Sequence, residues 1–339
     1  MSFLESRLYK AFYDVIRKNK TLNHLAHKII QSERMRKFPF YRNIYDKIIE
    51  KKSAQYMNAP NVIEFEITNK CNSNCIMCPP EVHLGNDFID HELFKRIAKE
   101  GRELGIRRMV FTGGEPLLDK LIFDKIKYAK ELGYTYVHMF TNGSLLIDSF
   151  RENLLKSGLD SLTISFDSAI KEEYEKIRAG LNYDKTVNNI KSLCILKKKL
   201  KSDIPIVRIN MVALPENLHS RRFFIQTFRG FADIVEIIDE HNFAGSVETD
   251  FSTREYSQTS RDPCHILFIK ACITPTGCLK KCSIDHTAKA EICDLRTTSF
   301  KDAVYSERLV KIKKDHLLHT FSESGCTNCT QRESWWVDY

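Results

Sequence analysis

The sequence predicts an α/β protein built on a partial (β/α)6 barrel, with a helical N-terminal extension and a small cysteine-rich C-terminal domain. Three observations lead to this prediction. Strand-like and helix-like segments alternate six times, several strands carry one polar face, and seven cysteines lie between residues 260 and 330. We expect the domains to be residues 1–59, 60–245 and 246–339.

In the central part of the chain, short apolar or β-branched runs are followed by segments of helical period. The expected strands are 62–68, 108–112, 135–141, 160–166, 204–213 and 233–238. The expected helices are 91–104, 119–132, 146–157, 170–201 with a break near Gly180, and 219–229. Such repeats predict a parallel sheet whose right-handed crossovers place the helices outside.

Three of these strands alternate between an apolar and a polar face. The apolar face carries Ile63, Phe65, Ile67, Leu162, Ile164, Phe166, Val207, Ile209 and Met211. The polar face carries Glu64, Glu66, Thr68, Thr163, Ser165, Asp167, Arg208 and Asn210. Because the face under the helices must be apolar, we expect the polar face to line a lumen that holds a polar ligand. The alternative is an open sheet with one face in water.

The positive charge of the chain is concentrated at its N-terminus. Residues 1–52 hold 13 Lys or Arg and 5 Asp or Glu, so they carry the whole net charge of +8. We therefore expect no nucleic-acid binding by the catalytic domain. The helical extension is expected to pack on the main domain as a lid or buttress. The alternative is that residues 1–52 contact an anionic membrane surface or an acidic partner.

The sequence contains no apolar stretch of membrane-spanning length and no apolar signal core at the N-terminus. We therefore expect a cytoplasmic protein. In that reducing compartment, clustered cysteines are better explained as metal ligands or redox groups than as disulfides.

The first cysteine cluster follows the first expected strand, where barrel enzymes place their chemistry. Cys71, Cys75 and Cys78 lie in CNSNCIMC. Three thiolates on one short loop can bind three irons of a cubane and leave the fourth iron open. The alternative is a zinc site, which usually needs four protein ligands.

This CxxxCxxC triplet resembles the signature of the radical S-adenosylmethionine (SAM) superfamily, with Met77 where an aromatic residue is usual. The resemblance implies a TIM-like partial barrel and a [4Fe-4S] cluster bound by three cysteines and SAM. It also implies a flavodoxin- or ferredoxin-like electron donor. In that family, one electron cleaves SAM to methionine and a 5′-deoxyadenosyl radical, which abstracts a hydrogen atom from the substrate.

Further motifs match the family's SAM contacts. Gly113, Gly114, Glu115 and Pro116 resemble the GGEP motif that holds the methionyl amino group. Asn142, Ser165, Asp167 and Arg178 lie where relatives contact the ribose or the methionyl carboxylate, and a guanidinium can bind a carboxylate bidentately. Asn210, Leu214 and Asn217 resemble adenine-side contacts.

The C-terminal cysteines resemble the twitch and SPASM extensions of the same superfamily. The spacing of Cys264, Gly277 and Cys282 matches their opening motif, and TPTG at 274–277 predicts a hairpin turn between the strands bearing these cysteines. Cys326 and Cys329 form a CxxC after a helix expected at 300–314.

The position where a full SPASM domain has its next cysteine is Trp335, so we expect the shorter twitch form. The resemblance implies one auxiliary [4Fe-4S] cluster on Cys264, Cys282, Cys326 and Cys329. A four-thiolate zinc site is the alternative. Cys272, Cys278 or Cys293 could replace one of these ligands, and Cys194 is expected to be a small core residue.

The layout is most similar to twitch enzymes of the 2-deoxy-scyllo-inosamine dehydrogenase type. It implies oxidation or rearrangement at a C–H bond of a hydroxylated or amino-bearing small molecule or sugar. The candidate catalytic residues are His138, Arg208, Asp239 and His241. For His138 the alternative is a hydrogen-bonded core imidazole. The alternative functions are modification of a ribosomally made peptide and, from another class, a non-catalytic electron-transfer or zinc-binding protein.

Overall fold

A computed structural model describes residues 39–79, 85–247, 249 and 262–330. The chain divides into two units, residues 1–56 with 332–339, and residues 57–331. The described part of the first unit is helix α4 (Pro39–Asn58), whose last two residues belong to the second unit. The helices expected within residues 1–38 lie outside the described residues. Within the described ranges, no helix is both long and apolar enough to cross a membrane.

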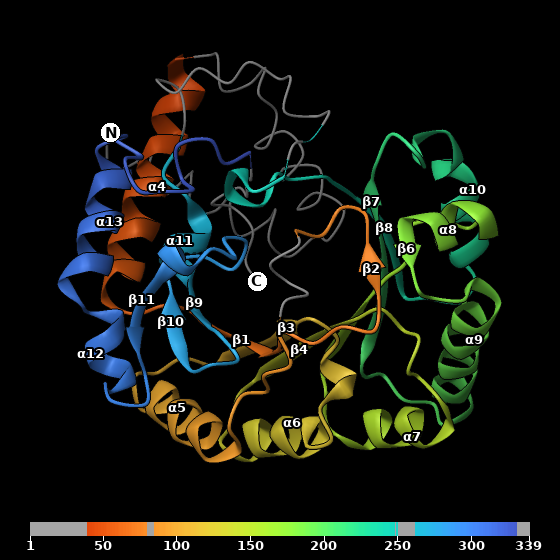
Figure 1. Cartoon of the computed structure of the whole chain (residues 1–339). Helices are drawn as coiled ribbons and strands as arrows, with labels where there is room; N and C mark the ends of the chain where they lie inside the picture. Colours follow the sequence, from red (N-terminus) through yellow and green to blue (C-terminus); the bar gives the residue numbers. More distant parts are fainter. Residues whose placement is uncertain (1–38, 80–84, 248, 250–261, 331–339) are drawn as a thin grey trace, which may run out of the picture. The chain divides into compact units, whose positions relative to one another are not determined.

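The second unit is built on one curved sheet of nine strands (Figure 1). These are β1 (Val62–Thr68), β3 (Arg108–Gly113), β4 (Tyr136–Thr141), β5 (Ser161–Ser165), β7 (Ile206–Ala213), β8 (Ile234–Asp239), β9 (Lys270–Ile273), β10 (Cys278–Lys280) and β11 (Glu291–Asp294). Their order in the sheet is β11-β10-β9-β1-β3-β4-β5-β7-β8. The six expected barrel strands are confirmed, and β1, β3, β4, β5, β7 and β8 pair in parallel.

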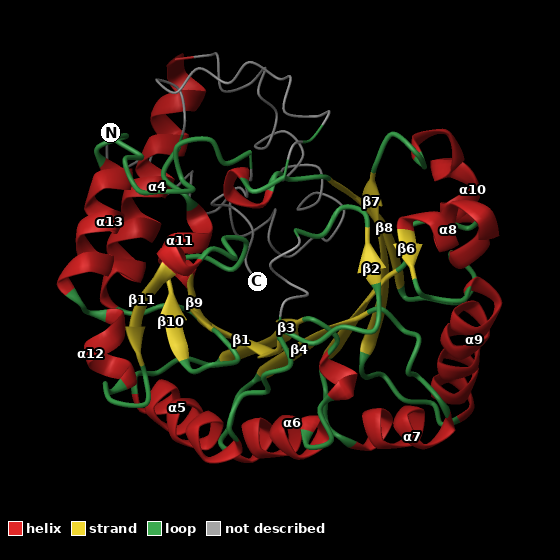
Figure 2. Cartoon of the chain, viewed as in Figure 1, coloured by secondary structure: helices red, strands yellow, loops and turns green. Residues whose placement is uncertain are grey.

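Helices cover the outer face of this sheet, as the crossovers require (Figure 2). They are α5 (His91–Glu103), α6 (Ile122–Glu131), α7 (Asp148–Lys156), α8 (Lys171–Ile177), α9 (Tyr183–Lys199), α10 (Arg221–Phe228), α12 (Phe300–Val304) and α13 (Glu307–Leu317), whereas the short α11 (His265–Ile269) leads directly into β9. Their starts have local causes. Asp90 caps α5 by accepting a hydrogen bond from the backbone N–H of Leu93 at 2.8 Å.

The core lies between the sheet and these outer helices. Phe65 on β1 and Phe111 on β3 pack against Phe94 of α5, with ring centroids 4.9 and 6.0 Å from that of Phe94. All three rings are fully buried. Burial of such a side chain stabilises a fold by about 1.5–3 kcal/mol. The apolar face predicted from the alternation therefore forms the core.

The expected break of the helix near Gly180 is present, and it makes room for a short strand that pairs with the first cysteine loop. Between α8 and α9 the chain forms the two-residue strand β6 (Arg178–Ala179), which pairs with β2 (Asn74–Cys75) of the first cysteine loop. Gly180 then turns the chain with φ of +93°, a conformation that favours glycine. A continuous helix could not place Arg178 opposite Cys75.

The C-terminal strands extend the barrel sheet itself. β9 pairs in parallel with β1, and the hairpin expected at 274–277 joins β9 to β10 in antiparallel fashion. The single helix expected at 300–314 is wrong, because the chain forms α12 and α13 with an interruption at Tyr305–Ser306. Ser306 occupies the N-cap position of the second helix, with extended backbone angles (φ −56°, ψ 144°) that end the helical path, although its side chain makes no capping hydrogen bond.

Candidate functional site

The first cysteine loop begins at the carboxyl end of β1. Cys75 is buried, whereas Cys71 and Cys78 are partly buried. A hydrogen bond from the Cys78 thiol outweighs burial and, with the Arg178 guanidinium, lowers the pKa of Cys75 to about 6. Burial raises the pKa of Cys71 to about 11. The loop therefore carries one stabilised thiolate, Cys75, and two further thiols.

A buried ion pair stands beside this thiolate. Arg178 Nη2 lies 2.7 Å from Asp167 Oδ2, and Arg178 Nη1 lies 3.6 Å from Cys75 Sγ. Burial disfavours the charged guanidinium, but Asp167 and Cys75 raise the pKa of Arg178 above its ordinary value. Asp167 is fixed in turn by the backbone N–H of Val212, which donates to its Oδ1 at 2.8 Å. Arg178 Nε is buried and has no hydrogen-bond partner among the described residues.

The GGEP segment packs directly on the cysteine loop. The backbone N–H of Gly114 donates to Thr68 O at 2.7 Å, and that of Glu115 donates to Lys70 O at 2.9 Å. A Cβ atom on Gly114 would lie 2.1 Å from Lys70 O, and one on Gly113 would lie 2.5 Å from Thr68 O. The glycines are therefore required by the close approach of two backbone segments.

Glu115 is fully buried and holds the neighbouring loop. Its Oε1 accepts hydrogen bonds from Thr141 Oγ1 at 2.8 Å and from the backbone N–H of Leu117 at 3.0 Å. Its Oε2 accepts one from the backbone N–H of Asn142 at 2.7 Å. Burial raises the pKa of Glu115. Pro116 follows as the first residue of a 3-10 turn. Glu115 thus fastens the ends of β3 and β4 together.

The remaining predicted SAM contacts lie at the same edge of the sheet. Asn142 Nδ2 donates to Asn72 Oδ1 of the cysteine loop at 2.8 Å. Ser165 and Asn210 are register partners on β5 and β7, and Asn210 Oδ1 is buried without a hydrogen-bond partner among the described residues. Leu214 packs in one apolar cluster with Cys75 and Met77.

Asn217 has a different position from the one expected of a ligand contact. Its Nδ2 donates to Asp167 O at 2.7 Å and to Val212 O at 2.9 Å, and its Oδ1 accepts from the backbone N–H of Leu214. All these bonds lie within the chain. The side chain therefore fixes the loop after β7.

The four C-terminal thiols expected to act together influence one another's ionisation. Burial, together with the neighbouring Cys264, raises the pKa of Cys282 to about 12. Burial also raises the pKa of Cys326 to about 12, with additional effects of Cys264, Cys282 and Cys329. Contrary to the expectation, the hairpin strands carry Cys272 and Cys278, whereas Cys264 precedes α11 and Cys282 follows β10.

The other C-terminal cysteines differ in their surroundings. Cys272 is fully buried and interacts electrostatically with Cys282 and Glu64. Leu279 is the register partner of Cys293, and Cys278 that of Asp294, so both cysteines belong to the β10–β11 ladder. Cys194 is buried on α9, as expected of a core residue.

Of the four predicted catalytic residues, His138 is buried and the other three are partly or fully exposed. His138 on β4 is buried, its Nδ1 has no hydrogen-bond partner in the described ranges, and burial lowers its pKa to about 3, with Arg208 and Lys270 contributing. Arg208 on β7 is partly exposed, and its Nη1 lies 3.9 Å from Glu236 Oε2. Asp239 is exposed at the end of β8, and His241 contacts the ring of Phe243.

The sequence reasoning missed three residues that face the lumen from the C-terminal segment. Lys270 Nζ lies 3.1 Å from Glu64 Oε2, and Lys280 forms a buried ion pair with Glu66. His286 Nδ1 lies 3.9 Å from Glu66 Oε1, and burial lowers the His286 pKa to about 3. Two buried glutamates on β1 were the available signal, because buried carboxylates need cationic partners.

Glu66, Lys280 and His286 border a cleft of about 230 Å³. Gly113, Gly114 and Thr68 line it from the barrel, whereas Lys280 and His286 line it from the C-terminal segment. The cleft therefore lies between the GGEP segment and the loop that follows Cys282.

The donor set of the first loop fits an iron-sulfur cluster, because it offers three thiols, one of them stabilised as a thiolate. In the described ranges, no three or more Cys, His, Asp or Glu side chains converge on one metal ion. The orphaned Arg178 Nε and Asn210 Oδ1 fit a polar organic ligand beside the loop.

Comparison with known proteins agrees with this geometry. Residues 65–228 match the family described as the radical SAM superfamily. A probable GTP 3',8-cyclase of Methanocaldococcus jannaschii is 28% identical over 179 residues, which are 52% of this chain and 58% of that protein. The chain thus spans little more than half the length of this curated relative.

Two solved structures share the fold. SuiB of Streptococcus suis, bound to the precursor peptide SuiA, has a TM-score of 0.62 and 14% identity, and the match covers 80% of this chain and 70% of SuiB. BtrN in complex with AdoMet and 2-DOIA has a TM-score of 0.55 and 17% identity, with 82% of this chain and 98% of BtrN covered. At these identities the likeness concerns the fold alone.

Proposed function

We propose that this chain, whose residues 65–228 belong to the radical SAM superfamily, holds a [4Fe-4S] cluster on Cys71, Cys75 and Cys78 and cleaves SAM reductively. The observation that carries the proposal is the convergence of the three-cysteine loop, the GGEP segment and the buried Arg178–Asp167 pair at the carboxyl ends of parallel strands. With SAM bound, such a cluster would supply a 5′-deoxyadenosyl radical that abstracts a hydrogen atom from the substrate.

The residues of the chain would bind and orient SAM. Arg178, which is buried beside Cys75, is suited to the methionyl carboxylate because its guanidinium keeps an unused Nε–H. Asn210 Oδ1 is an unused acceptor on β7 and suits the exocyclic amine of adenine. Glu115 would act through the loop that it fastens, together with Gly113, Gly114 and Pro116. Ser165, Asp167, Asn142 and Leu214 complete the proposed site.

A second, auxiliary [4Fe-4S] cluster is proposed on Cys264, Cys282, Cys326 and Cys329. Its support is the mutual electrostatic influence of these thiols, which come from three separate segments of the chain. Four thiolates close the coordination of such a site, so it would store or transfer an electron without binding SAM.

For the substrate we propose a hydroxylated or amino-bearing small molecule or sugar, which is oxidised or rearranged at a C–H bond. The cleft beside Gly113 and Gly114 offers carboxylate, ammonium and imidazole groups to such a molecule. BtrN, whose structure is in complex with AdoMet and 2-DOIA, shares the fold over nearly its whole length. The peptide-bound SuiB structure supports peptide modification as the second candidate.

Anaerobic reconstitution with iron and sulfide tests the proposal. With dithionite and SAM, the full chain should release 5′-deoxyadenosine, measured by liquid chromatography and mass spectrometry. Cys75→Ala should abolish the release, because it removes the stabilised thiolate of the loop. Cys194→Ala is the matched control, since Cys194 is a buried cysteine on α9 with no part in the site. A wild-type chain that holds its cluster but releases no 5′-deoxyadenosine contradicts the proposal.

A further inference from the structure

We infer that Lys281 is a positioning residue for the auxiliary site, because it joins the loop that carries Cys282 to the loop that carries Cys326. We further infer that its ammonium group is a fixed positive charge that compensates the thiolates of that site. The inference rests on the auxiliary cluster of the proposed function. It adds a residue that holds the two cysteine-bearing loops together and raises the midpoint potential of the cluster.

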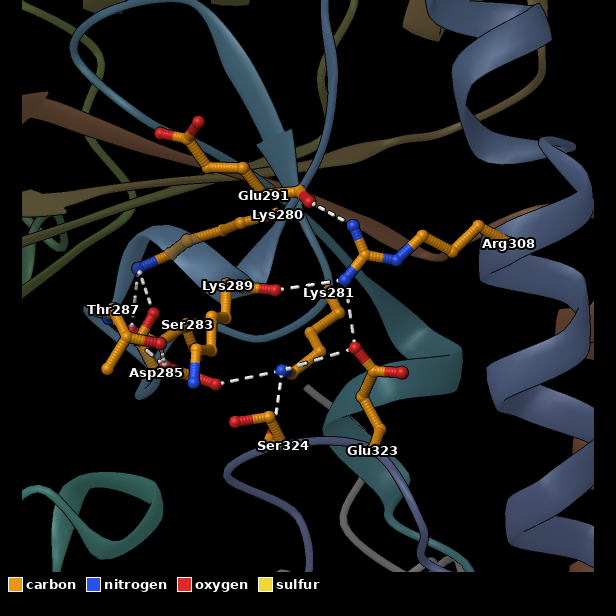
Figure 3. A network of polar contacts seen from close by, with 10 residues as sticks. All are labelled: Lys280, Lys281, Ser283, Asp285, Thr287, Lys289, Glu291, Arg308, Glu323 and Ser324. Carbon is orange, nitrogen blue, oxygen red and sulfur yellow. Dashed lines mark hydrogen bonds and ion pairs between the residues drawn. The ribbon is translucent and has the colours of Figure 1, made fainter.

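Lys281 is buried at the meeting point of the two loops (Figure 3). Its Nζ lies 2.9 Å from Asp285 Oδ2 in its own loop and donates to Ser324 O of the other loop at 2.5 Å. Glu323 Oε1 lies 3.8 Å from the same Nζ. One ammonium group therefore contacts both loops, with Asp285 Oδ2 on one side and Ser324 O on the other.

Asp285 holds the first loop in shape. Its Oδ1 accepts hydrogen bonds from Thr287 Oγ1 at 2.7 Å and from the backbone N–H of Thr287 at 3.1 Å. Lys280 Nζ also donates to the carbonyls of Ser283 and Asp285, both at 3.3 Å. Burial alone would raise the pKa of Asp285, but the bonds from Thr287 and Lys281 lower it. The buried partner of Lys281 is therefore ionised at neutral pH.

Glu323 anchors the second loop. Its Oε1 lies 2.9 Å from Arg308 Nη2, and Arg308 also donates to the carbonyls of Lys289 and Glu291 (Figure 3). The backbone N–H of Cys326 donates to the carbonyl of Glu323 at 2.9 Å. The position of Glu323 thus determines where the CxxC segment begins.

The network also balances charge beside the thiols. Lys281 immediately precedes Cys282, and its Nζ donates to the carbonyl of Ser324, two residues before Cys326, so its ammonium group lies between the segments that carry these two cysteines. Replacing Lys281 by a neutral residue would leave the carboxylates of Asp285 and Glu323 facing a site that is itself anionic. Added negative charge makes reduction of an iron-sulfur cluster less favourable. A residue with a merely structural role would not have this effect.

The experiment compares Lys281→Met, Lys281→Arg and Lys289→Met in the full reconstituted chain. Lys289→Met is the matched control, because the exposed Lys289 joins the network only through its carbonyl. The readouts are iron and sulfide content, the midpoint potential of the auxiliary cluster from an electron paramagnetic resonance redox titration, and the melting temperature of the metal-free protein. A Cys326→Ala/Cys329→Ala variant identifies the auxiliary signal and should lack about four irons per chain.

Lys281→Met should lower the melting temperature of the metal-free protein. It should also reduce the iron content toward that of the double cysteine variant, and give any remaining auxiliary cluster a more negative midpoint potential. Lys281→Arg should restore the potential. If Lys281→Met does not fold, Glu323→Gln, which is partly exposed, should shift the potential in the opposite direction, to a less negative value, because it removes a negative charge beside the site.

Equal iron content and equal potential in Lys281→Met and Lys289→Met would overturn the inference. If the wild type and the double cysteine variant bind the same amount of iron, the auxiliary cluster itself is refuted. The two failures are therefore distinguishable.

Discussion

At the scale of single residues, several buried polar groups in this protein have well-defined partners while others have none. Glu64, Glu66 and Glu115 are satisfied by the chain itself. His138 Nδ1 is buried without a partner among the described residues. Such an atom costs free energy unless something else donates to it. A substrate hydroxyl in the lumen, which can both donate and accept a hydrogen bond, would therefore satisfy His138 Nδ1 in either tautomer.

The protonation of His138 leads to a prediction about acid stability. Its pKa is about 3 in the fold and 6.5 in the reference state, so the folded chain binds fewer protons than the unfolded chain between these values. The stabilisation from the neutral imidazole is complete above pH 6.5 and is lost as the pH falls toward 3. The expected slope is about 1.4 kcal/mol per pH unit.

The measurement is the free energy of unfolding of the metal-free chain at pH 7 and pH 5. His138→Gln should lose less stability over this interval than the wild type, because glutamine does not titrate. Equal losses in His138→Gln and the wild type would show that His138 is protonated in the fold.

At the scale of elements, the GGEP segment and the first cysteine loop form one assembly. Each glycine is in contact with backbone of the loop, and Glu115 ties the segment to the start of the next loop. These contacts hold the two short segments in a fixed position relative to each other. The positions of the three cysteine side chains therefore depend on glycine at position 114, because a Cβ atom there would clash with the cysteine loop.

Gly114→Ala should therefore disrupt the first site. The added Cβ would lie 2.1 Å from Lys70 O, and backbone cannot move aside as a flexible side chain can. We expect the reconstituted variant to lose about four irons per chain and its 5′-deoxyadenosine release, while the auxiliary signal stays. Gly230→Ala is the control, because a Cβ there meets no atom within 4 Å. Normal iron content in Gly114→Ala would show that the loop can relax.

The sequence predicted the long helices and strands, because the spacing of their apolar residues shows which face of each element is buried. It could not show β6, because two residues have no period, and the pairing of Arg178 with Cys75 follows from that strand. Only the resemblance to a family pointed to Arg178. Likewise, no local signal places β9 beside β1, so the ion pair of Lys270 with Glu64 was not foreseen. Contacts between distant segments depend on the assembled sheet.

At the scale of the whole molecule, the C-terminal segment completes the barrel sheet. β9 covers the edge of β1, and Lys270 and Lys280 neutralise two glutamates that β1 buries. Removal of this segment would leave an open strand edge and two unpaired buried carboxylates. Both are costly, the first through aggregation and the second through lost stability.

A chain that ends at residue 246 should therefore lack a cooperative thermal transition, measured by circular dichroism. Adding Glu64→Gln and Glu66→Gln to that truncated chain should improve its solubility, since these changes remove the unpaired charges. A truncated chain that melts cooperatively at the temperature of the full chain would show that residues 60–245 fold as an independent domain.

The pairing of β1 with β9 also has a consequence for how the protein is made. The ribosome releases β1 about 200 residues before its neighbour β9 exists. During this interval one edge of β1 is unpaired in the nascent chain. Glu64 and Glu66 also lack their ion-pair partners, Lys270 and Lys280. If iron and sulfide bind to the first loop before the last strands emerge, they bind to a sheet that still lacks β9, β10 and β11. We expect chaperones to cover the unpaired edge of β1 until these strands are made.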